Sequence, residues 1–295
     1  MKWKDREKST NVEDRRAQGS SGRGGISMGT IMMLWPIIKP LFKTKFGWAL
    51  IAIGVVAYIS GYNPLSLLGM GESTTTVVDE KKDDAQADFM KTVLADTEVV
   101  WSDIFRSYGH SYKEPKVVLF RGSTKSGCGY ASAQMGPFYC PNDEKVYLDL
   151  GFFDELKNRY NAGGDFAQAY VLAHEIGHHI QNLQGILDQV QNLKQQLRSE
   201  AKVNALQVNV ELQADCYAGL WAHHAQERFN MLEEGDIEEA LNTASAIGDD
   251  ALQKKTQGYV VPDSFTHGSS KQRMEWFYKG FKSGDLKACN TFSSK

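Results

Sequence analysis

Five consecutive residues, His174 to His178, constrain the fold of this chain more than any other feature. They read H-E-I-G-H, and on an α-helix two side chains four positions apart lie on one face, about one turn apart. From that face both imidazoles can reach one Zn²⁺ ion at about 2.0–2.1 Å, and Glu175 can take a proton from a water that the ion activates. The preceding Tyr170 to Ala173 is an apolar run that would bury the helix. Because buried imidazoles and carboxylates are costly without partners, the pattern favours a metal site over an accidental motif on a solvent-facing helix.

A third ligand is required, since zinc in hydrolases takes three protein ligands and keeps one open position. Glu211 and Asp215 lie four positions apart in a helical stretch with apolar residues interleaved. We expect Glu211 to complete the ligand set with His174 and His178. We expect Asp215 to accept the free N–H of a ligating histidine and so fix its tautomer. Without the motif upstream, two ordinary acids on a solvated helix face would be the simpler interpretation.

The N-terminal part of the chain predicts a membrane anchor. No charged residue occurs between Lys45 and Glu72, and the segment 46–68 begins with the apolar run FGWALIAIGVVAYISGY. That run rises about 25 Å as a helix, and its flank can supply the rest of a hydrocarbon core of about 30 Å. Basic residues before it and acidic residues after it favour a cytoplasmic N-terminus. The alternatives are a buried core helix and a cleaved signal peptide; the long basic region and the lack of an A-x-A site disfavour the latter.

Four parts of the chain follow from this interpretation. Residues 1–45 are expected to form a polar, basic cytoplasmic tail, flexible over residues 1–27. Residues 46–68 are the transmembrane signal anchor, residues 69–84 a polar linker, and residues 85–295 the folded domain.

Charge and cysteine content narrow the function further. The formal net charge of −3 argues against a nucleic-acid-binding protein, which usually carries a basic surplus. The four cysteines form no C-x-x-C pair and allow three disulfide pairings. We favour Cys128–Cys140, which bracket a short Gly-rich stretch, with Cys216–Cys289 as the second pair. Four reduced cysteines in a cytosolic protein are the alternative, which the predicted export to an oxidising compartment disfavours.

Hydrophobic periodicity predicts an α+β domain, mostly helical, with a small sheet. Apolar residues at helical spacing predict a helix from Gln86 to Tyr108. Lys116–Phe120 and Lys145–Leu150 have the composition of short strands. After Gly151 the chain is expected to be helical over 152–160, 166–183, about 185–226, 236–247 and 269–283. The strand at 146–150 is a candidate edge to which an extended substrate could add, and an ordinary core strand is the alternative.

Several motifs together resemble one known family. They are NVEDRR, the single predicted span, GPFYCP, HEIGHH, ELQADCYAG, AIGDD and VPDSFTHGSSKQR. Over nearly the whole chain they resemble the bacterial "putative neutral zinc metallopeptidase" family, and H-E-x-x-H followed by E-x-x-A-D is similar to the gluzincin class. The resemblance implies a zincin-like, membrane-anchored peptidase with a Zn²⁺ cofactor, and it supplies no substrate.

The segment 264–273 is similar to the His-Pro-rich segment of membrane-associated gluzincins, in which a His and a following Arg serve the substrate. The carried-over residues are His267 and Arg273, although Gly268 stands where that pattern often has Pro. Both are candidate donors to an oxyanion, and a capped surface helix with incidental charges is the alternative. His179, His223 and His224 are interpreted as packing or surface residues, with His223 or His224 as a stray ligand as the alternative, and His110 as a turn residue.

These observations predict zinc-dependent hydrolysis of peptide bonds. The substrate would be a peptide or protein, Glu175 the general base, and the location the inner membrane with the catalytic domain in the periplasm. The alternative is a membrane-tethered binding or scaffold protein with a structural or relict zinc site. A fourth protein ligand would favour that alternative.

Overall fold

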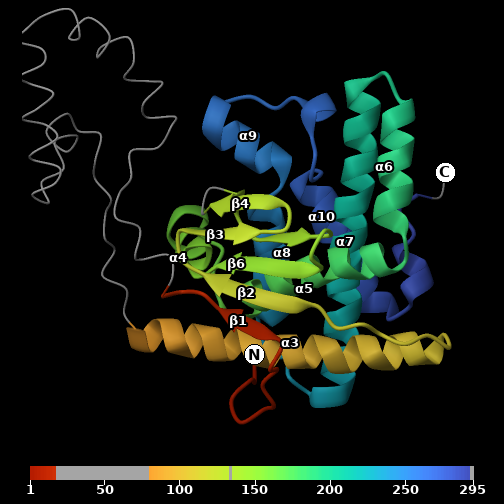
Figure 1. Cartoon of the computed structure of the whole chain (residues 1–295). Coiled ribbons are helices and arrows are strands. Elements are labelled where there is room, and N and C mark those ends of the chain that lie inside the picture. The colour runs from red at the N-terminus through yellow and green to blue at the C-terminus, as the bar shows by residue number, and fades with distance from the viewer. Residues whose placement is uncertain (18–79, 133–134, 293–295) are drawn as a thin grey trace, which may run out of the picture. The chain divides into compact units, whose positions relative to one another are not determined.

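The computed structural model describes residues 1–17, 80–132 and 135–292. The elements in chain order are β1 (Val12–Asp14), α3 (Glu80–Ser107), β2 (Lys116–Phe120), β3 (Ser123–Ser126), β4 (Gly129–Ser132), β5 (Phe138–Cys140), β6 (Lys145–Asp149), α4 (Leu150–Tyr160), α5 (Asp165–Leu183), α6 (Ile186–Gln196), α7 (Glu200–Phe229), α8 (Asp236–Ala246), α9 (Asp249–Gln257), the 3₁₀ turn η5 (Pro262–Ser264), α10 (Ser270–Ser283) and η6 (Leu286–Cys289). The domain therefore mixes helices with two small sheets (Figure 1).

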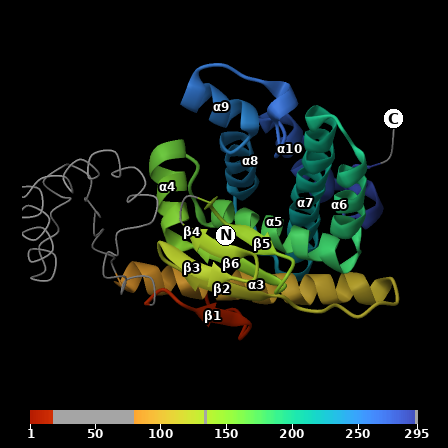
Figure 2. The same ribbon diagram turned by 45° about the horizontal axis from the view of Figure 1, so that its top comes forward.

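The larger sheet has the strand order β1-β2-β6-β5. β1 and β6 both pair with β2 in parallel, whereas β5 pairs with β6 antiparallel. Four of the five residues in both β2 and β6 are buried, as expected for central strands covered on both faces. The long helix α3 runs along this sheet in both views (Figures 1 and 2). The strands predicted at 116–120 and 145–150 are thus confirmed, with β6 ending at Asp149.

Glycines allow the main helices to pack closely. A Cβ on Gly219 of α7 would lie 1.9 Å from the carbonyl oxygen of Phe277 in α10. A Cβ on Gly280 of α10 would lie 2.0 Å from the carbonyl oxygen of Cys216 in α7. No side chain fits at either position, so α7 and α10 cross with their backbones in contact.

Two disulfides confirm the favoured pairing. Cys128–Cys140 joins the turn between β3 and β4 to β5, and Cys216–Cys289 joins α7 to η6. Disulfides of this kind are compatible with an exported protein.

The first seventeen residues belong to the folded domain and are not the flexible tail expected from their composition. Val12, Glu13 and Asp14 pair with Val117 to Leu119 in the central sheet. Trp3 donates through Nε1 to the carboxylate of Asp165 at 3.1 Å. The composition was misleading because many of these charges are paired within the fold, as between Lys145 and Glu13 at 2.6 Å.

The predicted single-pass anchor is corrected by the structure. Within the described ranges, no helix has the length and apolar character needed to cross a membrane, and the predicted segment 46–68 lies outside them. β1 precedes that segment and β2 follows it, yet the two are neighbours in one sheet. A single crossing would place them on opposite sides of a bilayer. The predicted single pass, and with it the inner-membrane localisation that sets tail and domain on opposite sides, is therefore wrong.

Other boundaries also differ from prediction. α3 begins at Glu80, within the expected linker. The helix expected over 185–226 is two helices, α6 and α7, because Leu197 and Ser199 adopt extended backbone angles. α9 was not predicted, and the Gly-rich segment 122–141 contains three strands, β3 to β5.

Candidate metal centre

The site forms where α5 and α7 pack against each other. Gly177, between the two histidines of the motif, faces Ala214, between Glu211 and Asp215. A Cβ on Gly177 would lie 3.0 Å from both the Cα and the carbonyl oxygen of Ala214. The glycine in the motif thus lets the two backbones approach until the side chains of both helices reach one point.

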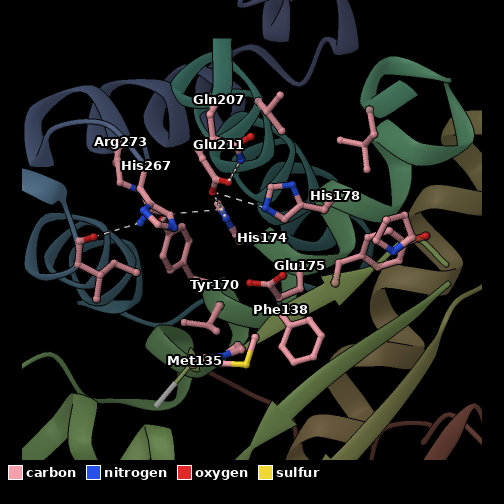
Figure 3. A pocket seen from close by; sticks show the side chains of 18 of the residues that line it. Met135, Phe138, Tyr170, His174, Glu175, His178, Gln207, Glu211, His267 and Arg273 are labelled. Carbon is pink, nitrogen blue, oxygen red and sulfur yellow. Dashed lines mark hydrogen bonds and ion pairs between the residues drawn. The ribbon is translucent and has the colours of Figure 1, made fainter. Parts of the chain in front are cut away.

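Three ligand atoms converge there. Oε2 of Glu211 lies 3.2 Å from Nε2 of His174 and 3.5 Å from Nε2 of His178, and the three ligand atoms lie within 4.8 Å of one another. Ligands about 2.05 Å from a tetrahedral zinc ion are separated by about 3.3 Å. Two imidazoles and a carboxylate at these distances fit a zinc ion (Figure 3). The sequence prediction that these three residues meet agrees with the structure.

Asp215 lies behind His174 and joins it to two further residues. Its Oδ1 accepts from Nδ1 of His174 at 2.8 Å and from the hydroxyl of Tyr170 at 2.6 Å. Arg273 donates to Oδ2 through Nε at 2.8 Å and to Oδ1 through Nη2 at 2.9 Å. Burial raises the pKa of Asp215, but Arg273 and His174 outweigh it and lower that pKa to about 2. Asp215 is therefore ionised and holds the His174 ring with Nε2 directed at the site.

The electrostatics favour positive charge between the carboxylates. Burial lowers the pKa of His174, but Asp215 and Glu211 outweigh it and raise that pKa to about 9. Burial raises the pKa of Glu211, but the two histidines hold it well below its usual range. The same carboxylates would attract a divalent cation to this position.

Further polar partners fix the other two ligands. Gln207, one turn before Glu211 on α7, donates to Oε1 of Glu211 at 2.8 Å and accepts from Lys194 of α6. Nδ1 of His178 lies 2.9 Å from Oε1 of Gln181. Each ligand thus has a second partner that orients it.

A cleft of about 550 Å³ opens onto these ligands, within the range usual for ligand sites. Glu175 lines it, with its carboxylate directed into the cavity on the side of Phe138 (Figure 3). β5 also lines the cleft through Phe138 and Tyr139. The candidate substrate edge is therefore β5, because the strand predicted at 146–150 lies between β2 and β5.

His267 and Arg273 both line the cleft but differ in what they are free to contact. The His267 side chain is 53% exposed, and that of Arg273 is 3% exposed. Arg273 is committed to Asp215 and Tyr170, with Nη1 3.4 Å from the carbonyl oxygen of Ile247. Both residues were expected to be donors to an oxyanion. In the structure the guanidinium of Arg273 is bonded to Asp215 and Tyr170, whereas the side chain of His267 is exposed to the cleft.

Asp249 holds the loop that carries His267. Its Oδ2 accepts from the backbone N–H groups of Thr266, His267 and Gly268 at 2.7, 2.6 and 3.0 Å. Oδ1 lies 3.3 Å from Nδ1 of His267. This hydrogen bond is the main reason that the pKa of His267 is raised, and the contact leaves Nε2 as the atom available to a substrate.

Sequence reasoning missed three residues of the site: Tyr170, Gln207 and Asp249. The first two share the spacing of the motif, since 170, 174 and 178 and likewise 207, 211 and 215 are steps of four on one helix face. That spacing could have identified them. Asp249 has no such spacing signal. It begins α9 and binds a loop about 17 positions further along the chain, and only tertiary packing brings the two together.

The fold and site together define a class: metal-dependent hydrolases in which one helix supplies two histidines and a second helix a glutamate. The chain belongs to the family described as "Putative neutral zinc metallopeptidase", whose model matches residues 1–292. It is 47% identical to "Uncharacterized protein YpfJ" of Escherichia coli K12 over 299 residues, covering 99% of each chain. It is 42% identical to "Uncharacterized protein Rv2575" of Mycobacterium tuberculosis over 207 residues, 67% of each chain. No solved structure matches the chain.

Proposed function

We propose that this protein hydrolyses peptide bonds with zinc as cofactor, in the manner of gluzincin peptidases. The observation that supports this most directly is the position of Glu175. Glu175 lines the same cleft as the three residues whose ligand atoms converge, but it is not one of them (Figure 3). That is the place required of a general base.

Each residue has a role in this proposal. A zinc ion held by His174, His178 and Glu211 would supply Lewis acidity and acidify a water in its open position. Glu175 takes the proton and passes it to the leaving amine. His267 in its protonated form, which Asp249 favours by raising its pKa, donates through Nε2 to the oxyanion that forms at the attacked carbonyl.

Arg273 and Tyr170 act through Asp215. They hold its carboxylate ionised and in place, and Asp215 keeps the proton of His174 on Nδ1. Nε2 of His174 is then available as a ligand.

The cleft suits an extended peptide. Among the described residues β5 is the last strand of its sheet and lines the same cleft as the ligand residues, so an extended substrate can add to the sheet there. The apolar lining, which includes Phe152, Val171 and Val190, favours substrates with large apolar side chains near the cleaved bond.

Glu175→Gln tests the proposal. The purified chain and this variant are incubated with a peptide library, and cleavage is read by mass spectrometry beside zinc content. We expect cleavage to fall by at least about 10²-fold, the usual contribution of a general base, while zinc bound to His174, His178 and Glu211 is retained. The exposed Glu234→Gln is the matched control and should cleave like the unchanged chain.

Two outcomes count against the proposal. Equal cleavage by Glu175→Gln would remove that residue from the mechanism. Zinc at the site without cleavage of any peptide would favour the scaffold alternative. The structure favours that alternative less, because the group has three ligand residues in the described part of the chain, and a structural zinc site has four.

A further inference from the structure

A second group of ligand residues lies at the other end of α7. His223, His224 and Glu227 place ligand atoms within 4.8 Å of one another. They are separated from Glu211 by twelve residues or more, about 18 Å along the helix, so they do not belong to the centre described above. The side chains of the two histidines are 28% and 32% exposed and that of Glu227 is 64% exposed, which leaves the group open to ions from solvent.

Both imidazoles are held in orientations that suit metal binding. Nδ1 of His223 donates to the carbonyl oxygen of Phe281 at 2.7 Å, and Nε2 of His224 donates to that of Gly284 at 2.9 Å. Because these nitrogens are donors, Nε2 of His223 and Nδ1 of His224 carry the free lone pairs when the rings are neutral. A backbone carbonyl on the non-ligating nitrogen is the usual second partner of a metal-bound histidine.

The two free nitrogens face the same carboxylate. Nε2 of His223 lies 3.4 Å from Oε1 of Glu227, and Nδ1 of His224 lies 3.5 Å from Oε2. The two distances run to different oxygens of Glu227, so one carboxylate lies within reach of both imidazoles, and one ligand atom from each residue lies within 4.8 Å of the others. The glycine at position 284 leaves room beside Nε2 of His223, because a Cβ on Gly284 would lie 2.5 Å from that nitrogen.

We propose that His223, His224 and Glu227 form a second binding site for a divalent transition-metal ion, of which Zn²⁺ is the natural probe. Two imidazole ligands suit zinc, nickel and copper, whereas calcium and magnesium prefer sites made of oxygen ligands. The carbonyls of Phe281 and Gly284 belong to the C-terminal end of α10. An ion bound here would therefore fasten that end of α10 to α7, the two helices whose crossing places Arg273 against Asp215.

Glu227→Gln is the sharpest test. It removes the charge that faces both imidazoles but leaves their bonds to Phe281 and Gly284 intact. The full chain is stripped of metal with a chelator, checked by circular dichroism and titrated with Zn²⁺ against a chromophoric competitor. The exposed Glu200→Gln, the same change on the same helix, is the matched control.

We expect the unchanged chain and Glu200→Gln to bind two ions each. Glu227→Gln should keep one ion at unchanged affinity and bind the second at least about tenfold more weakly. Glu211→Gln should lose the other ion instead, which makes the two sites separable. A single ion on the unchanged chain that Glu227→Gln still binds like the control, or two ions bound by Glu227→Gln like the control, overturns the proposal and leaves the histidines as caps of α10. A single ion that Glu227→Gln loses and Glu211→Gln keeps would support this site and count against the first centre instead.

Discussion

Asp215→Asn removes the charge that joins His174 to Arg273. The amide can accept at one oxygen only, and its NH₂ group faces donors. The Arg273 guanidinium is then buried without a counter-ion, since its side chain is 3% exposed and both of its ion-pair hydrogen bonds go to Asp215. Breaking a buried ion pair by removing one partner costs about 3–5 kcal/mol. Zinc affinity should also fall by about 10–100-fold, because the partner of a ligating histidine is lost.

The assay is urea unfolding in the presence of a chelator, so that metal binding does not contribute to the free energy of unfolding. Zinc affinity is measured separately by competition. Asp103→Asn is the matched control, because Asp103 pairs with Arg228 at the same 2.8 Å but with side chains 41% and 53% exposed. We expect the control to cost at most about 1 kcal/mol.

A double-mutant cycle that combines Asp215→Asn with Arg273→Met measures the interaction free energy between Asp215 and Arg273. The double variant should cost less than the sum of the single changes by about 0.5–3 kcal/mol, since the uncompensated charge is gone. Additive costs, or a cost for Asp215→Asn no larger than for Asp103→Asn, would refute the assignment of Asp215 as the buried counter-ion.

The lowered pKa of Asp215 predicts how the free energy of unfolding changes with pH. The pKa of Asp215 is lowered to about 2 in the fold, against about 3.9 in an unfolded chain. The stability that its charge contributes is therefore present above about pH 4 and lost as the pH falls toward 2. The difference in free energy of unfolding between the unchanged chain and Asp215→Asn should shrink in that acid range. It should also shrink as the pH rises from about 6.5 through 9, because burial lowers the pKa of His174 but Asp215 is the main cause that raises it to about 9, and the protonated ring is lost there.

Three further changes test other parts of the site. Gly177→Ala puts a Cβ against the backbone of Ala214 and should destabilise by about 1–3 kcal/mol, with weaker zinc binding; unchanged zinc affinity would contradict the close approach of α5 and α7. Asp249→Asn should lower peptidase activity, because the loop before α10 loosens. The pKa of Asp249 is lowered, so the stability that this carboxylate contributes, measured by urea unfolding, should be lost as the pH falls below about 4. An effect of the substitution that does not change with pH would argue against an ionised carboxylate. Replacing Cys216 and Cys289, which lie 73 positions apart, by alanine should cost about 4 kcal/mol in urea unfolding; a loss under about 1 kcal/mol would show that the bridge constrains the unfolded chain little.

Local spacing was sufficient to pair the candidate ligands within each helix. His174 and His178 are one turn apart whatever surrounds them, because the geometry of a single helix decides it. The same holds for Glu211 and Asp215, and for the short strands β2 and β6, whose residue types suit strands without reference to the rest of the chain.

Tertiary structure alone decided which helix faces meet and where distant segments lie. Arg273 is 58 positions from Asp215, and nothing in the spacing between them distinguishes a buried counter-ion from a donor to substrate. β1 lies about a hundred positions from its partner β2, and its short charged sequence carries no period that predicts a strand. Such contacts depend on how well whole surfaces pack once the loops between them close. The free energy of this packing is shared over many residues, whereas the helical turn that brings two histidines together depends on five consecutive residues.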